Sequence, residues 1–170
     1  MCSMAEQTIT GPLAAETVAG VSEAATPHGE AWGAVARTHA AVTGRLQEAL
    51  AQAGFPPLPW YEVLAAVADA PEQRLRMGDL AEALVITRGG LTKLVDRLVK
   101  AGLMERAVCE ADRRVSYATL LPAGSNLLEE MRPVVTAELE LAFSANITTR
   151  QAEQLTEMLD RVRGGACGAA

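Results

Sequence analysis

Seven basic residues lie in one short stretch, Ile86 to Arg114, that holds only four acidic residues. The stretch carries a net charge of +3, whereas the rest of the chain, with eight basic and seventeen acidic residues, carries −9. A basic segment inside an acidic protein predicts a local anion-binding face, and a solvated helix with balanced ion pairs is the alternative. The seven residues are Arg88, Lys93, Arg97, Lys100, Arg106, Arg113 and Arg114.

Residues suited to metal binding or catalysis are scarce and scattered. The histidines are His28 and His39, and the cysteines are Cys2, Cys109 and Cys167. None stands at metal-ligand spacing, and no HExxH, CxxC, phosphate-binding glycine loop or nucleophile elbow occurs. We therefore predict no enzyme, no cofactor and no metal site. An odd number of scattered cysteines argues against a disulfide framework and favours a reducing, cytoplasmic setting.

Length and composition indicate a globular protein of one domain, or of one domain with a dimerisation extension. The chain has 170 residues, of which 49% are hydrophobic and 21% charged, which excludes a wholly disordered chain. The longest apolar run, Val63 to Ala68, is too short to cross a membrane. The N-terminus lacks the pattern of a signal peptide, so we expect no membrane partner.

Two short helices joined by a tight turn are predicted to position the basic residues. The first runs from about Gly78 to Leu84. The second opens at Thr87, whose hydroxyl can cap the first turn, and continues to about Ala101. Gly102 ends it as a C-terminal cap. This is the helix-turn-helix pattern, with a second helix rich in basic residues.

A period of two follows this pair of helices. It predicts strands at Leu103–Cys109 and Val115–Leu120, joined by the charged connection Glu110–Arg114. A hairpin directly after a helix-turn-helix is called a wing.

Helical periodicity predicts four further helices around this region. They run from Glu30 to about Gly54, from Trp60 to Ala70, from Pro122 to about Asn146 with a kink at Pro133, and from Thr148 or Thr149 to Gly164–Gly165. Before them we expect a tail with at most one short helix, around Leu13 to Glu23.

Several motifs in this order resemble the MarR family of bacterial transcription regulators. The resemblance covers about Glu30 to Arg163. The wing motif is specific because of its distance from the second helix. The matching segments are Met77–Ala81, Leu91–Leu98, Ala101–Arg106, Asp112–Arg114 and Leu120–Gly124.

The resemblance implies a mainly α fold with a small β wing, in which N- and C-terminal helices form a dimerisation region around a winged helix-turn-helix lobe. The expected divisions are a flexible tail at 1–29, a first dimerisation helix at 30–57, the DNA-binding lobe at 58–121, dimerisation helices at 122–163 and a loose tail at 164–170.

Two departures from the family pattern concern helix starts. Leu121 stands where a capping threonine is usual. Gly89 and Gly90 stand where small polar residues are usual, and each glycine costs a helix about 1 kcal/mol relative to alanine. Their bare backbone also permits close approach to a phosphate.

By resemblance, the second helix lies in the major groove of double-stranded DNA, with Thr87, Arg88 and Gly89 at its start. Arg88 and Thr92 occupy positions that approach bases. Lys93 and Arg97 are better placed for phosphates. An ion pair of Arg97 with Asp96 or Glu105 is the alternative.

On the wing, Arg114 matches the family arginine that enters the minor groove. Arg113 is a candidate phosphate contact. Asp112 is expected to hold the arginine or the turn in place without touching DNA. Lys100, near the helix end, is expected to favour the helix dipole.

By resemblance, a small aromatic or phenolic ligand is expected, since many family members bind one between the dimer helices and the DNA-binding lobe. The candidate binding residues are Trp32 and His39 on the first long helix, and Trp60 and Tyr61 on the next. Ordinary packing of the tryptophans, and a buried, hydrogen-bonded His39, are the alternatives.

The predicted function is a homodimeric transcriptional repressor that binds a dyad-symmetric operator and is released by a small ligand. A redox-sensing regulator using Cys109 beside the wing is one alternative. A winged helix that contacts proteins and not DNA is another, although it predicts loss of the basic residues that this chain retains.

Overall fold

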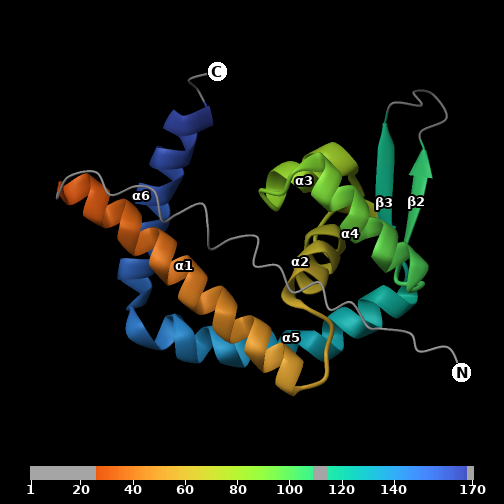
Figure 1. Ribbon diagram of the computed structural model, residues 1–170, viewed down its shortest axis with the longest axis horizontal. Helices are drawn as coiled ribbons and strands as arrows, with labels where there is room; N and C mark the ends of the chain where they lie inside the picture. The colour runs from red at the N-terminus through yellow and green to blue at the C-terminus, as the bar shows by residue number, and fades with distance from the viewer. Residues whose placement is uncertain (1–25, 109–114, 168–170) are drawn as a thin grey trace, which may run out of the picture. The chain divides into compact units, whose positions relative to one another are not determined.

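The computed structural model describes residues 26–108 and 115–167. Those residues are mostly helical, with one three-stranded antiparallel sheet, which confirms the predicted fold class (Figure 1). The chain divides into two units, Met1–Gly44 and Arg45–Ala170, and each is described by itself.

The first unit contributes most of helix α1, Pro27–Gln52, which continues into the second. The helix begins three residues earlier than the sequence predicted. Pro27 occupies the first helical position, where a missing amide hydrogen costs nothing. Thr26 precedes it, and its Oγ1 accepts a hydrogen bond from the Gly29 amide at 3.1 Å. The expected tail boundary at residue 29 is therefore wrong.

In the second unit, helix α2, Leu58–Ala68, begins two residues before the predicted start. Pro59 lies in its first turn, where proline is tolerated. A 3-10 turn, Pro71–Gln73, follows and leads into strand β1, Arg74–Arg76, which was not predicted from the sequence.

The helix-turn-helix consists of α3, Met77–Ala83, and α4, Arg88–Lys100. Between them Val85 has a φ of +53°, in the left-handed region that valine rarely adopts, and its side chain is 92% exposed. Gly102, with a φ of +73°, ends the motif. Its amide and that of Leu103 donate to the carbonyls of Val99 and Leu98, so the predicted glycine cap is confirmed.

The sheet has the order β1-β3-β2. Strand β2 is Met104–Val108 and strand β3 is Ser116–Leu120, and they stand side by side next to α4 in Figure 1. Their pairing confirms the stems of the predicted hairpin. One face, which carries Ala118 and Leu120, turns into the core.

The core of the second unit lies between α2, α3, α4, the sheet and the start of α5. Burial of these apolar side chains is what holds the basic helix α4 in place. The cluster consists of Val63, Leu64, Val67, Leu80, Ala81, Leu91, Leu94, Val95, Leu98, Met104, Ala118, Leu120 and Leu128.

The C-terminal part contains α5, Pro122–Ala142, a 3-10 turn at Ser144–Asn146, and α6, Thr149–Cys167. Helix α5 continues through Pro133 and stops four residues before the predicted end. Helix α6 continues through Gly164 and Gly165. The predictions that these glycines end the helix and that a loose tail begins at 164 are therefore wrong.

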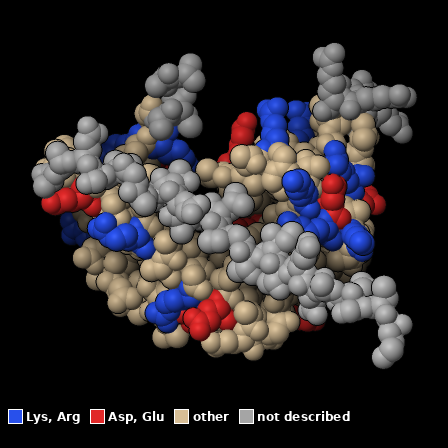
Figure 2. Space-filling model, viewed as in Figure 1, with Lys and Arg blue, Asp and Glu red and all other residues tan. Residues whose placement is uncertain are grey.

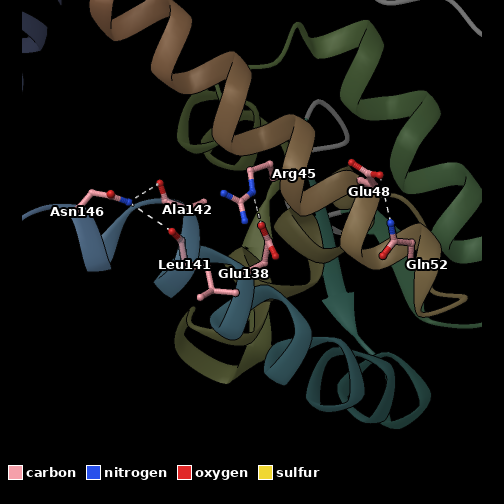
Figure 3. A network of polar contacts seen from close by, with 7 residues as sticks. All are labelled: Arg45, Glu48, Gln52, Glu138, Leu141, Ala142 and Asn146. Carbon is pink, nitrogen blue, oxygen red and sulfur yellow. Dashed lines mark hydrogen bonds and ion pairs between the residues drawn. The ribbon is translucent and has the colours of Figure 1, made fainter.

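Helices α1 and α5 are joined within the second unit by an ion pair. Arg45 Nε lies 2.5 Å from Glu138 Oε1, and the two side chains point toward one another in Figure 3. Glu138 is largely covered, with 18% of its side chain exposed. The pair links the last two turns of α1 to α5.

Two kinds of feature do not occur among the described residues. No helix there is long and apolar enough to cross a membrane. No group of three or more His, Cys, Asp or Glu residues is placed to hold a metal ion.

Candidate nucleic-acid interface

Helix α4 begins with a side-chain cap, as the sequence predicted. Thr87 has an extended backbone, and its Oγ1 accepts a hydrogen bond from the Gly90 amide at 3.2 Å. Its carbonyl accepts the first helical bond, from Leu91, at 2.9 Å. The cap compensates in part for two glycines in the first turn.

The two faces of α4 differ in character. Leu91, Leu94, Val95 and Leu98 are buried on the face that packs against the core. The opposite face carries the exposed side chains of Arg88, Lys93, Arg97 and Lys100. Figure 2 shows Lys and Arg side chains gathered over this helix. The four predicted basic residues of α4 are therefore exposed to solvent together.

Thr92 lies half-buried on the border between the two faces. Its hydroxyl donates a hydrogen bond to the carbonyl of Arg88 at 2.9 Å. The bond holds the hydroxyl close to the helix and leaves its oxygen lone pairs as acceptors.

Among the described residues, Arg97 does not form the alternative ion pair with Asp96 or Glu105. Arg97 Nε donates to the carbonyl of Lys93 at 3.3 Å. Asp96 instead lies 3.5 Å from Arg106 on β2. The positive charge of Arg97 therefore stays on the exposed face of α4.

A hollow of about 310 Å³ opens beside the start of α4, where three segments meet. It lies between the β1–α3 junction, the first turns of α4 and the first residues of β3. Arg88 and Thr92, both predicted as base-approaching residues, line the same hollow. The other lining residues are Arg76, Met77, Gly78, Asp79, Val115 and Ser116.

The arginines of β1 were not predicted from the sequence. Arg76 lines the hollow, and its Nε donates a hydrogen bond to the hydroxyl of Tyr117 at 3.2 Å. Arg74 lies over the Tyr117 ring, with its guanidinium carbon 4.0 Å from the ring centroid. In the sequence, this strand is indicated only by the alternation of Arg74, Leu75 and Arg76. Three residues are too few to predict a strand.

The predicted wing-tip residues Asp112, Arg113 and Arg114 lie outside the described residues, and so does Cys109. The described stems extend to Val108 and from Ser116.

The four candidate ligand-binding residues belong to different units. In the first, Trp32 is 56% exposed and His39 is exposed, so the alternative of a buried His39 is wrong for the chain by itself. In the second, Trp60 and Tyr61 are partly buried and pack against the core. That contact agrees with the packing alternative for Trp60.

Parts of the sequence are similar to known proteins of one family. The model of the MarR family matches residues 53–115. The transcriptional regulator MhqR of Bacillus subtilis is 26% identical over 130 residues, which cover 75% of this chain and 86% of MhqR.

Solved structures share the fold over most of the chain. Sco3205 of Streptomyces coelicolor, a MarR family regulator solved in complex with DNA, is 28% identical, with a TM-score of 0.76 over 84% of this chain and 91% of Sco3205. BpsR of Bordetella bronchiseptica, described with regulation of its DNA binding by 6-hydroxynicotinic acid, is 20% identical, with a TM-score of 0.66 over 79% of this chain and 98% of BpsR. The family-model match, the curated relative and the solved structures all make this chain similar to the MarR family of winged-helix transcriptional regulators.

Proposed function

We propose that this protein binds double-stranded DNA in a sequence-specific manner, with α4 as the recognition helix in the major groove. The observation that carries the proposal is the exposed basic face of α4 on a core-packed helix, in a chain whose remainder is acidic. The DNA complex of the similar Sco3205 supports it.

The proposed contacts divide by chemistry. Arg88 and Thr92 approach base edges, and an arginine paired with a guanine is worth about 1–3 kcal/mol of discrimination. Thr87 and Gly89 bring the bare start of the helix close to the backbone, and Lys93 and Arg97 contact phosphates. On the wing, Arg114 enters the minor groove, Arg113 contacts a phosphate and Asp112 orders the turn.

The protein acts as a homodimer in this proposal. Helix α6 leaves Met158, Leu159 and Val162 exposed, and the C-terminal half of α5 leaves Leu139 and Leu141 exposed. Apolar side chains gathered on terminal helices favour burial against a second copy. Two recognition helices then bind half-sites about one helical turn, ~34–36 Å, apart on a dyad-symmetric operator.

The regulator is proposed to be a repressor that a small aromatic ligand releases. Trp32, His39, Trp60 and Tyr61 are the residues proposed to bind it. The effect of 6-hydroxynicotinic acid on the structurally similar BpsR supports a ligand of this class.

Fluorescence anisotropy tests the proposal. The full chain is titrated onto a duplex from the region upstream of its own gene and onto a scrambled duplex, with and without salicylate as the probe. We expect selective binding that falls steeply with salt, because phosphate contacts release counterions. Loosening by salicylate supports the ligand proposal. Selective binding that salicylate leaves unchanged argues against a phenolic carboxylate.

A selection from a genome-wide DNA pool follows if the upstream duplex shows no preference. Failure to select any sequence there contradicts the DNA-binding proposal and favours a winged helix used for protein contact.

A further inference from the structure

Arg76 and Tyr117 form a side-chain pair at the edge of the hollow beside α4. Arg76 is the last residue of β1, and its register partner across the sheet is Tyr117 of β3. Its Nε donates to the tyrosine hydroxyl at 3.2 Å, and its guanidinium carbon lies 5.9 Å from the ring centroid, within the range of a cation–π contact. These contacts restrain the exposed Arg76 side chain.

Arg74 provides a built-in comparison on the same strand. It lies two residues away on the same face of β1 and stacks on the same ring, at 4.0 Å. Both arginines are exposed and carry the same charge. Only Arg76 lines the hollow. A comparison of the two residues therefore distinguishes a contact made at the hollow from a general effect of positive charge.

The opposite walls of the hollow have the chemistry of a phosphate-binding surface. Arg88 and Thr92 come from α4, and Ser116 comes from the start of β3. Two guanidinium groups and the Ser116 hydroxyl can donate to the anionic oxygens of a phosphodiester, whereas the Thr92 hydroxyl already donates to the carbonyl of Arg88. Arginine pairs with phosphate in a bidentate manner. Asp79 also lines the hollow, so its charged side chains sum to +1.

We propose that Arg76 contacts a DNA phosphate and that Tyr117 is the positioning residue that orients it. The inference rests on the proposed function and adds to it a contact from β1, an element outside the helix-turn-helix and the wing tip. An arginine that is already held in place loses less rotamer freedom when the complex with DNA forms. If β1 arginines serve only to discourage strand addition at the sheet edge, Arg74 and Arg76 are equivalent.

The test compares R76A with R74A in the full chain, by anisotropy against the tightest duplex found for the wild type, at several salt concentrations. We expect R76A to weaken binding roughly tenfold or more and to lower the salt slope by about two per dimer, one for each lost phosphate contact. R74A, which removes the same charge, is expected to change affinity less than about threefold. Arg76 makes no side-chain cap on α3, so R76A removes no cap hydrogen bond from that helix.

The role of Tyr117 is tested with Y117F and with R76A/Y117F. The phenylalanine keeps the ring for Arg74 and removes only the hydroxyl. We expect Y117F to weaken binding in the wild-type background and to have no further effect beside R76A, because it acts through that residue. Melting curves check that each variant is folded.

The outcomes separate the two proposals. Equal affinities and salt slopes for R74A and R76A overturn the role of Arg76 and leave the DNA-binding function standing. Additive losses in the double variant overturn the role of Tyr117 alone. A folded wild-type protein that selects no DNA overturns the proposed function and this inference with it.

Discussion

Asp96 Oδ1, on the exposed face of α4, lies 3.5 Å from Arg106 Nη1 on β2. One acid of the basic segment is thus paired within the chain, and it reduces the positive charge that this face presents. The side chains are 58% and 38% exposed, so the pair contributes little to stability.

The variant D96N is expected to bind DNA of any sequence a few-fold more tightly at low salt, because the face gains one net positive charge per subunit. Its free energy of unfolding is expected to change by less than about 1 kcal/mol. E157Q, which removes an exposed acid from α6, is the matched control and should leave affinity unchanged. A D96N protein that binds no better than E157Q contradicts the assignment of this face.

The packing around position 124 leaves no room for a side chain, so the position requires glycine. Gly124 is buried in the first turn of α5, and a Cβ atom there would lie 2.2 Å from the carbonyl oxygen of Leu103. That carbonyl also accepts a hydrogen bond from the Leu121 amide at 3.0 Å. The clash is with backbone, so it cannot be relieved by a rotamer change.

We therefore expect G124A to lower the free energy of unfolding by about 1–3 kcal/mol or more, measured by urea denaturation. In G44A, the new methyl meets nothing within 4 Å, and gains in helix propensity should raise stability by up to about 1 kcal/mol. Similar midpoints for the two variants would show that α5 shifts freely at its start.

Val85 is expected to be a strained residue. It adopts a φ of +53° in the turn of the helix-turn-helix, with a 92% exposed side chain that gains little from packing. The left-handed conformation costs a non-glycine residue roughly 1–2 kcal/mol. We expect V85G to raise the melting temperature, with a net gain of about 0.5–1 kcal/mol after the entropy cost of glycine. V108G, at an exposed strand valine, should lower it instead.

The wing prediction concerns Arg114. Its replacement by alanine is expected to weaken operator binding about tenfold or more, because minor-groove contacts are lost from both subunits. Molecular mass and helix content should stay as in the wild type. R150A removes an exposed arginine of α6 and serves as the control. An unchanged operator affinity in R114A would exclude the proposed wing contact.

The dimer prediction concerns Val162, which is 66% exposed on α6. A glutamate there would place a charge in the proposed interface, at a cost of about 2 kcal/mol or more. We expect V162E to halve the mass measured by light scattering at micromolar concentration. A V162E protein of wild-type mass would exclude this face from the interface.

The sequence predicted elements whose signals are local. The Thr87 cap, the left-handed Gly102 and the start of α5 at Pro122 each depend on a residue and its nearest neighbours. Propensity was a weaker guide to helix ends. Gly164 and Gly165 lie within α6, which continues past both of them.

Features that depend on distant partners were not predictable. Strand β1 has three residues, and its partner Tyr117 lies 41 positions away from Arg76. Without that pairing, nothing marks Arg76 as a neighbour of Arg88. The hollow beside α4 is likewise built by three separate segments, so only its two α4 residues were candidates from the sequence.

The contact of α5 with Leu103 has a mechanical consequence. Leu103 connects the cap of α4 to β2, and its carbonyl meets the first turn of α5 through the Leu121 amide and the bare backbone of Gly124. The Leu120 side chain also lies here, with its Cδ1 2.8 Å from the place of a Cβ on Gly124, but the contact with Leu103 is made by backbone atoms. A displacement of the start of α5 is therefore expected to move Leu103, which lies between α4 and β2.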